Sequence, residues 1–297
     1  MTVQRCGFVS VIGLPNAGKS TLVNALVGSK VSIVSRKSQT TRTRVLGIAL
    51  HDHTQIMLID TPGIFSPKKT LEKAMVGAAL SSLEGVDTII HIVDASDRDC
   101  VDKQRSIFSH LKGQKAILVL NKVDRCDKPK LLATAQAFHT HFDYDATFMI
   151  SALQAKGVRD VMAYLSTELP EGEWVYDEDQ ITDMPMRLLA AEITREKVFN
   201  LLHQELPYSL YVETEQWENF DNGDIKISQV ITVEQESQKR ITLGKNGSKI
   251  KAIGQTSRLE LEEMLGCKVH LKLFVRVQDN WQERSDFYEI FGLNHSS

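Results

Sequence analysis

The sequence predicts an α/β domain with a mostly parallel sheet and helices on both of its faces, followed by a smaller α+β domain. Two observations predict this class. Strand-like and helix-like segments alternate over residues 1–170, an order that is typical of a parallel sheet covered on both faces. A stretch rich in Asp and Glu, without Lys or Arg, then precedes a second set of helical and extended patterns.

Composition sets broad limits on the class of protein. The chain has 297 residues, of which 42% are hydrophobic, which is enough for two cores. Its net charge of -3 indicates no general affinity for nucleic acid or membranes, so such a role must come from a local cluster. Four widely spaced cysteines match no zinc pattern, and no apolar run reaches membrane-spanning length. We expect a soluble, cytoplasmic protein with reduced thiols.

The first strand-like segment, residues 8–12, leads into Gly13-Leu14-Pro15-Asn16-Ala17-Gly18-Lys19-Ser20, and a helical pattern follows over 21–27. This spacing is typical of a loop whose backbone N–H groups wrap phosphates at a helix N-terminus. Lys19 would supply positive charge, and the Ser20 hydroxyl would bind Mg²⁺. The sequence therefore predicts a nucleoside triphosphate site that contains Gly13, Asn16, Ala17, Gly18, Lys19, Ser20 and Thr21.

Residues 31–44 lack apolar periodicity and predict a mobile loop. Segments 45–50 and 55–59 predict an antiparallel hairpin, which ends at Asp60-Thr61-Pro62-Gly63. A carboxylate at this position can hold Mg²⁺ through water, and the Gly63 N–H can meet a terminal phosphate. The tetrapeptide is an ordinary turn sequence by itself, so its position after the glycine loop is what favours this interpretation.

Two further strands, 87–93 and 116–120, enclose a helical pattern at 102–111, and Asn121-Lys122-Val123-Asp124 follows the second of them. A carboxylate such as that of Asp124 can accept two hydrogen bonds, from the N1–H and the amino group of guanine. Adenine offers no such pair of donors. The nucleotide is therefore predicted to be GTP.

Neighbouring residues complete the predicted base site. We expect Asn121 to brace the glycine loop and the stem of Lys122 to cover a face of the base. Ser151-Ala152 follows Phe148-Met149-Ile150, and a backbone N–H at this point could meet the guanine O6.

Four motifs in this order resemble the G domain of translation-factor-related GTPases: Gly13 to Ser20, Asp60 to Gly63, Asn121 to Asp124, and Ser151-Ala152. The resemblance implies that a threonine before the second strand binds Mg²⁺, for which we choose Thr41 with Thr40 as the alternative. Ile64 stands where Ras-type members carry a water-orienting glutamine, so we expect slow intrinsic hydrolysis. The expected catalytic residues are Lys19, Thr41 and Gly63, and the expected magnesium ligands are Ser20, Thr41 and Asp60.

The acidic stretch contains Pro170 and Gly172 and predicts the domain boundary. Trp174 and Tyr176 lie within it, and because large aromatic side chains gain by burial, they suggest a linker attached to one domain. The expected divisions are a G domain over 1–170, a linker over 171–184 and a second domain over 185–297.

In the second domain the sequence predicts helices at 186–202, 248–253 and 259–265, with Gly254 as a helix stop, and strands at 209–214, 225–233 and 268–276. Residues 240–243 fit a strand or a helical turn. A basic cluster surrounds Gly244-Lys245-Asn246-Gly247 and includes Lys249 and Lys251. With its flanking helices, this stretch resembles a KH domain, whose Gly-x-x-Gly loop clamps the backbone of single-stranded RNA.

The two domains in this order, with Gln39-Thr40-Thr41-Arg42 and Tyr176-Asp177-Glu178-Asp179-Gln180, resemble the Era GTPases. That resemblance implies a bacterial factor that binds the 3′ end of small-subunit ribosomal RNA and assists maturation of the small ribosomal subunit. We expect it to be a monomer that uses GTP and Mg²⁺. Asn16 stands where potassium-activated relatives carry an asparagine, which makes K⁺ a candidate second cation. Two alternatives stay open: a switch with peripheral contact to the inner face of the cell membrane, and an RNA binder with negligible turnover.

Overall fold

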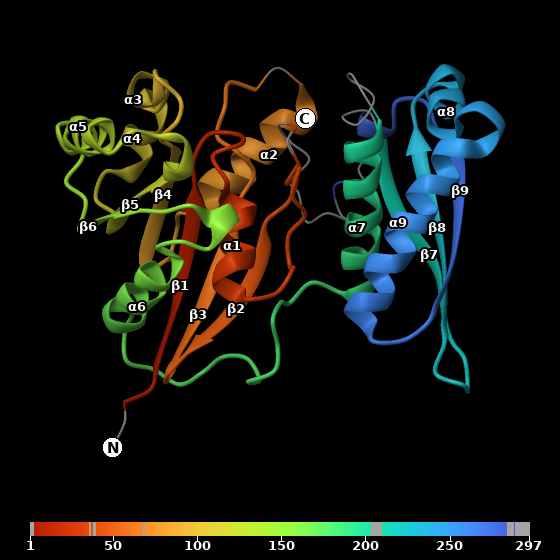
Figure 1. Ribbon diagram of the computed structural model, residues 1–297, viewed down its shortest axis with the longest axis horizontal. Helices are drawn as coiled ribbons and strands as arrows, with labels where there is room; N and C mark the ends of the chain where they lie inside the picture. The colour runs from red at the N-terminus through yellow and green to blue at the C-terminus, as the bar shows by residue number, and fades with distance from the viewer. Residues whose placement is uncertain are drawn as a thin grey trace. The chain divides into compact units, whose positions relative to one another are not determined.

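The computed structural model describes residues 3–35, 37, 40–67, 69–202, 210–283 and 288 (Figure 1). Its contacts divide the chain into two compact units. Among the described residues, the first unit contains those up to Ser32, Thr41–Asp183 and Tyr288. The second contains those of Ile33–Thr40 and those from Met184 onward. The change from the first unit to the second therefore falls between Asp183 and Met184, next to residue 185, where we expected the second domain to begin. The sequence did not predict that the described residues of Ile33–Thr40 would also belong to the second unit.

The first unit is built on a six-stranded sheet in the order β2-β3-β1-β4-β5-β6. Only β2 runs antiparallel to its neighbour, β3, so the predicted mostly parallel sheet is confirmed. The parallel order brings the carboxyl ends of β1, β3, β4 and β5 to one edge, where the nucleotide motifs follow. The strands are β1 (Arg5–Ile12), β2 (Val45–His51), β3 (Thr54–Asp60), β4 (Thr88–Asp94), β5 (Ala116–Asn121) and β6 (Ala146–Met149).

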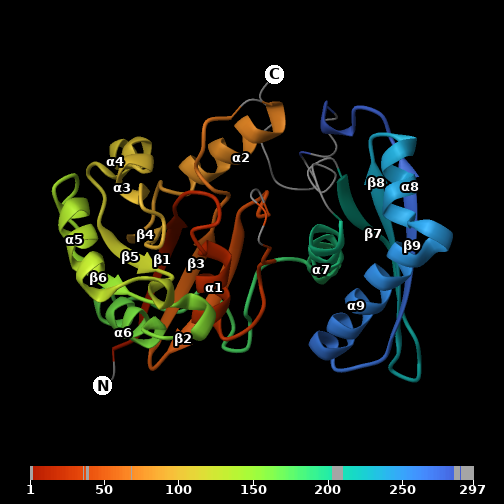
Figure 2. The same ribbon diagram turned by 45° about the horizontal axis from the view of Figure 1, so that its top comes forward.

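Helices cover both faces of this sheet, as predicted (Figure 2). Apolar side chains of α1 and α6 pack on one face, and those of α2, α4 and α5 pack on the other. Buried apolar side chains therefore lie on both faces of the strands. The helices are α1 (Lys19–Val27), α2 (Thr70–Ser81), α3 (Cys100–Lys103), α4 (Arg105–Leu111), α5 (Lys128–His139) and α6 (Val158–Glu168).

The single helix predicted over 102–111 is wrong, because the chain forms α3 and α4 with Gln104 between them. The Gln104 side chain is buried and lies 3.1 Å from Nε2 of His91 in β4. The other ring nitrogen of His91 lies 2.7 Å from the Tyr144 hydroxyl. This buried polar network joins residues far apart in sequence, so helical periodicity does not reveal it.

The acidic linker belongs to the first unit through 183. The buried side chain of Gln55 in β3 accepts the backbone N–H groups of Val175 and Tyr176 at 2.9 and 3.0 Å, and its amide donates to the Tyr176 carbonyl at 2.9 Å. The Thr182 hydroxyl donates to the Leu46 carbonyl of β2 at 2.6 Å. These bonds attach the linker to the β2–β3 hairpin.

The second unit has a three-stranded sheet in the order β7-β8-β9, with β7 antiparallel and β9 parallel to the central strand. Helices α7 and α9 pack apolar side chains on one face of it. Within the described part of the chain, no helix is both long and apolar enough to cross a membrane. The elements are α7 (Met186–Leu201), β7 (Leu210–Asn219), β8 (Ile225–Val233), α8 (Glu236–Leu243), α9 (Ser248–Leu265) and β9 (Val269–Val277).

Several details of the second unit differ from expectation. Residues 240–243 are helical, as the end of α8. The predicted stop at Gly254 is wrong, since α9 continues through it. A Cβ at this position would lie 3.5 Å from the Leu273 side chain of β9, an ordinary van der Waals contact, so a glycine is neither a helix end nor a packing requirement here. Strand β7 runs on to Asn219, and its predicted first residue, Ser209, lies outside the described residues.

Helix α7 also buries charged residues that the predicted apolar stripe did not include. Arg195 and Glu196 are 1% and 4% exposed. Arg195 donates to the Thr40 carbonyl at 2.6 Å, and Glu196 accepts the Val34 N–H at 2.8 Å. The backbone groups of Val34 and Thr40 are therefore bonded to this charged side of the helix.

Candidate nucleotide and RNA sites

The glycine loop joins β1 to α1, as the motif requires. Gly18 immediately precedes the helix with φ of 103°, a conformation that L residues with side chains rarely adopt. A Cβ on Gly18 would lie 2.2 Å from the Asn121 side chain, so nothing larger fits. Asn16 also has a positive φ, of 63°. The first turn of α1 thus lies directly behind a tightly curved loop, the arrangement that binds phosphate.

Lys19 is almost fully buried, and its ammonium group donates to the carbonyls of Gly13 and Leu14 at 3.2 and 3.0 Å. Burial lowers the pKa of Lys19 to about 8, while the nearby charge of Asp60 acts in the opposite direction. A polyanion bound in the loop would favour the charged form of the amine. The lysine is therefore held where the sequence places the phosphates.

Asp60 ends β3 in full burial, and its Oδ2 accepts hydrogen bonds from Ser20 at 2.6 Å and Thr41 at 3.4 Å. The Ser20 and Thr41 hydroxyl oxygens lie 2.9 Å apart. Burial raises the pKa of Asp60, and its hydroxyl donors and Lys19 oppose that rise. The Thr40 hydroxyl instead donates to the Lys37 carbonyl at 3.0 Å. The geometry therefore favours Thr41 over Thr40 as the threonine of the site.

The residues present fit Mg²⁺. Asp60 Oδ1 is buried and has no hydrogen-bond partner among the described residues. This carboxylate oxygen and the two nearby hydroxyl groups are hard oxygen ligands of the kind that Mg²⁺ prefers. A protein-bound Mg²⁺ ion usually also keeps several water molecules as ligands. A buried acceptor without a partner is costly, so a cation or its water would relieve the cost.

Gly63 follows β3 in close contact with the glycine loop. A Cβ on it would lie 2.7 Å from the backbone nitrogen of Pro15, so a side chain would displace the loop. The next residue, Ile64, is 4% exposed, and its N–H donates to the Gly13 carbonyl at 3.2 Å. The side chain of Ile64 thus packs in the core.

Asn121 joins two of the predicted loops. Its side-chain amide donates to the Ala17 carbonyl at 2.8 Å, and its oxygen accepts the Ala152 N–H at 2.9 Å. The predicted brace of the glycine loop is present, and the second bond is new. In this structure the Ala152 N–H is thus engaged by Asn121, and the predicted contact of Ser151-Ala152 with guanine O6 stays a prediction.

Lys122 adopts a positive φ of 62°, and its ammonium donates to the Asn16 carbonyl at 2.7 Å and to Asp94 at 2.6 Å. Asp94 ends β4 and was missed from the sequence, because no local motif marks it. The Asp124 side chain is 21% exposed and lies 3.8 Å from that of Arg125. Its carboxylate is accessible, which the predicted guanine contact requires.

The basic Gly-x-x-Gly stretch forms a tight turn between α8 and α9. Gly244, Asn246 and Gly247 all have positive φ, and a Cβ on Gly244 would lie 2.9 Å from the Lys249 backbone nitrogen. Lys245 and Asn246 are exposed at the tip, as is Lys251 nearby, while Lys249 is half-buried. The turn places exposed backbone and positive charge at the N-terminus of α9, where phosphate is favoured.

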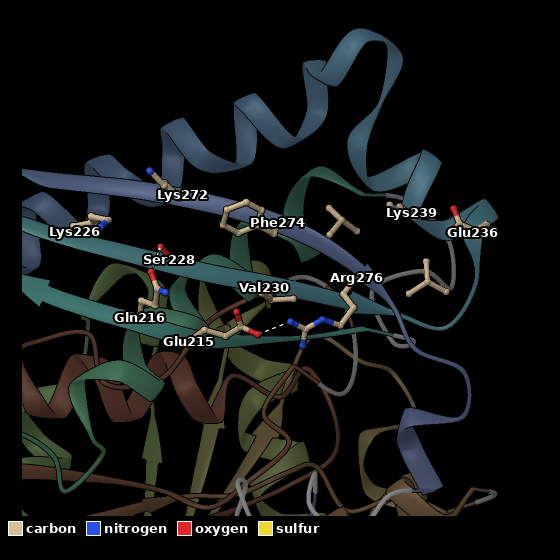
Figure 3. Close-up of a pocket in the computed structure, with 12 residues that line it drawn as sticks. Glu215, Gln216, Lys226, Ser228, Val230, Glu236, Lys239, Lys272, Phe274 and Arg276 are labelled. Carbon is tan, nitrogen blue, oxygen red and sulfur yellow. Dashed lines mark hydrogen bonds and ion pairs between the residues drawn. The ribbon is translucent and has the colours of Figure 1, made fainter.

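A separate hollow of about 720 Å³ lies on the second unit (Figure 3). Its lining includes Lys226 on β8 and Lys272, Phe274 and Arg276 on β9, none of which the sequence singled out. Arg276 pairs with Glu215 at 2.5 Å, so acidic and basic groups are mixed there. The hollow contains none of the predicted nucleotide or Gly-x-x-Gly residues.

Comparison with known proteins supports both domains. Residues 8–122 match a family described as 50S ribosome-binding GTPase, and residues 205–282 match the KH domain. The chain is 51% identical to GTPase Era of Maricaulis maris, over 99% of this chain and 98% of the relative. It is 53% identical to GTPase Era of Agrobacterium fabrum, over 97% and 92%. The chain belongs to the Era family of GTPases.

Solved structures of Era proteins agree with this assignment. Era in complex with MgGDPNP and nucleotides 1506-1542 of 16S ribosomal RNA matches with a TM-score of 0.92 and 38% identity, over 97% of this chain and 99% of that one. A variant of Aquifex aeolicus Era bound to GDP and AlF4⁻ matches with the same score, identity and coverage. The Era fold thus extends over both units of the chain.

Proposed function

We propose that this Era-family chain hydrolyses GTP with Mg²⁺ and binds the single-stranded 3′ end of small-subunit ribosomal RNA, and so assists assembly of the small ribosomal subunit in the cytoplasm as a monomer. The main support for the proposal is a combination of features in one chain. This chain, about half identical to Era proteins, has both a glycine loop beside a buried carboxylate oxygen without a described partner and a basic Gly-x-x-Gly turn. The solved Era complex with MgGDPNP and 16S RNA supports both ligands.

The residues act mainly by positioning and by charge. Ser20 and Thr41 would bind Mg²⁺ directly, and Asp60 would hold it through water. The ion would neutralise charge on the outer phosphates. Lys19 would stabilise the same negative charge, while the Gly63 N–H would fix the terminal phosphate. Because Ile64 is buried and aliphatic, no side chain at that position orients the attacking water, and intrinsic hydrolysis is slow.

The base site selects guanine by its hydrogen bonds. The Asp124 carboxylate accepts from the N1–H and the amino group, which adenine cannot offer. Asn121 keeps the base loop and the glycine loop at a set distance through its two buried bonds. Lys122 is fixed by Asn16 and Asp94, so its stem lies in one orientation along the base face.

The RNA site uses backbone and charge at the Gly244 to Gly247 turn. Because the glycines leave the backbone uncovered, RNA phosphates can approach it closely, and the nearby lysines attract them. Affinity should accordingly fall steeply with added salt.

GTP and RNA binding are linked in this proposal. The segment that ends at Thr40 is bonded to Arg195 and Glu196 of α7, and the next residue is the magnesium threonine. A nucleotide that holds Thr41 therefore also restrains a segment that α7 contacts. Linkage requires that RNA strengthen GTP binding by the same factor by which GTP strengthens RNA binding.

The test is RNA binding by Lys245→Asp/Asn246→Asp. The two carboxylates stand beside the phosphates, so affinity for an oligonucleotide of the 3′-terminal ribosomal sequence should fall roughly a hundredfold or more, with GTP affinity unchanged. The matched control is Lys272→Asp/Gln216→Asp, which makes the same charge change in the separate hollow. Equal losses in both variants would refute the assigned RNA surface. The membrane alternative would be favoured if the wild-type chain pelleted with anionic liposomes and showed no preference for this RNA over other RNA.

A further inference from the structure

Ser32 is a fourth polar residue at the magnesium site, and no sequence motif marks it. Its hydroxyl donates to Asp60 Oδ2 at 2.6 Å, as short as the bond from Ser20. Ser32 is 2% exposed. Oδ2 thus receives donors from Ser20, Ser32 and Thr41, while Oδ1 receives none from the described residues. Because the three hydroxyl donors all bond to Oδ2, Oδ1 stays available to accept a hydrogen bond from a water molecule bound to the metal.

The backbone of Ser32 is fixed by α1. The Asn24 side-chain oxygen accepts the N–H groups of Val31 and Ser32 at 3.0 and 2.9 Å, and its amide donates to the Ser32 carbonyl at 2.7 Å. Three hydrogen bonds from one side chain therefore set the position of Ser32. Because Asn24 lies in the same helix that begins at Lys19, the Ser32 hydroxyl is held in register with the glycine loop.

The roles of the three donors differ. Ser20 and Thr41 are proposed metal ligands, so their oxygens serve both the ion and Asp60. Among the hydrogen bonds of the described residues, the Ser32 hydroxyl takes part only in the one to the carboxylate, and Ser32 is not a proposed metal ligand. We propose that Ser32, held by Asn24, is a positioning residue of the GTPase site that fixes the orientation of the Asp60 carboxylate and so sets the affinity for Mg²⁺. This inference rests on the magnesium role proposed above for Ser20, Thr41 and Asp60.

A carboxylate that loses a positioning donor can rotate, and it must be reoriented when the ion binds. Outer-shell partners of metal ligands commonly change metal affinity by about 10- to 100-fold when they are removed. Ser32→Ala should therefore raise the Mg²⁺ concentration that half-maximally slows nucleotide release by roughly tenfold. At saturating Mg²⁺ the ion itself orients the carboxylate, so the release rate should return to within about twofold of wild type.

The experiment measures the dissociation rate of a fluorescent GDP analogue from the full chain across a range of Mg²⁺ concentrations. Ser32→Cys keeps the side-chain size but donates weakly, and Asn24→Ala releases the Ser32 backbone, so both should raise the midpoint as Ser32→Ala does. The matched control is Ser10→Ala. Ser10 is also a fully buried serine of this unit, but its hydroxyl lies 3.0 Å from that of Ser82.

An unchanged midpoint in Ser32→Ala and Ser32→Cys would overturn the inference, as would an equal shift in Ser10→Ala. Ser20→Ala separates this failure from that of the proposed magnesium site. If release from Ser20→Ala responds to Mg²⁺ as wild type does, the site itself is misplaced. If Ser20→Ala loses the response and Ser32→Ala keeps the wild-type midpoint, only the role of Ser32 is wrong.

Discussion

Asn121→Ala tests the connection between the glycine loop and the base loop. Asn121 is 3% exposed, and its side chain satisfies the Ala17 carbonyl and the Ala152 N–H. Truncation leaves both groups without that partner, and a buried polar group without a partner costs about 1–3 kcal/mol. The expected loss in the free energy of unfolding is therefore about 3 kcal/mol if water cannot replace either bond fully.

The same change should weaken GTP binding. If the two loops must be held together in the bound state, about 3 kcal/mol corresponds to roughly a hundredfold loss in affinity. Chemical denaturation gives the free energy of unfolding, and titration of a fluorescent GTP analogue gives the affinity. Asn121→Asp separates the two bonds, because its carboxylate can still accept the Ala152 N–H but cannot donate to Ala17.

Asn219→Ala is the control, since Asn219 ends β7 in the second unit and its exposed side chain accepts only the Trp217 indole N–H, at 3.1 Å, among the bonds described. A surface change of this kind should alter stability by less than about 0.5 kcal/mol. If Asn121→Ala changed neither the unfolding free energy nor GTP affinity by more than the control does, the brace would not matter and the reasoning would be refuted.

Three further predictions concern the base, the core and the cation. Asp124→Asn should lower the affinity for GTP by roughly a hundredfold and raise the affinity for xanthosine triphosphate, whose ring carries a carbonyl in place of the amine. Competition binding measures both affinities, and an unchanged GTP affinity would show that Asp124 does not bind the base. Burial lowers the pKa of His91 from 6.5 to about 4, so the unfolded state binds more protons between these values. Stability should thus fall by about 3 kcal/mol as pH drops from 6.5 to 4, and a denaturation series in which His91→Gln shows the same slope as wild type would contradict this. Hydrolysis should be faster in K⁺ than in Na⁺ at equal ionic strength, and Asn16→Ala should abolish the difference; a variant that still responds to K⁺ would exclude Asn16.

The main features of the nucleotide site are predictable because its chemistry places local demands on the backbone. A loop that wraps phosphate needs glycine where φ is positive, and the structure shows Gly18 in that conformation with no space for a Cβ. Parallel strands bring their carboxyl ends to one edge, so Asp60 and Asn121 had to lie near the loop once the strands were recognised. The KH-type turn was predictable for the same reason, since its glycines and lysines are consecutive.

Other members of the site depend on contacts between residues far apart in sequence. Asp94 fixes Lys122, and Ser32 bonds to Asp60, but Asp94 is an ordinary residue at the end of a strand and Ser32 an ordinary residue of a loop. The choice between Thr40 and Thr41 likewise depends on tertiary contacts, because the Thr41 hydroxyl donates to Asp60 whereas the Thr40 hydroxyl donates to the Lys37 carbonyl. The reading of Gly254 as a helix stop also failed, because α9 continues through it from Ser248 to Leu265.

The sequence by itself therefore determined the fold class, the two domains and the residues whose backbone must curve around a phosphate, because those demands are met within a few consecutive positions. Only the tertiary structure decided which hydroxyls converge on Asp60, and that the buried Arg195 and Glu196 of α7 bond to the backbone of Thr40 and Val34. Such pairs arise when strands and helices pack. Their energy depends on distance and burial in three dimensions, and no spacing along the chain encodes either.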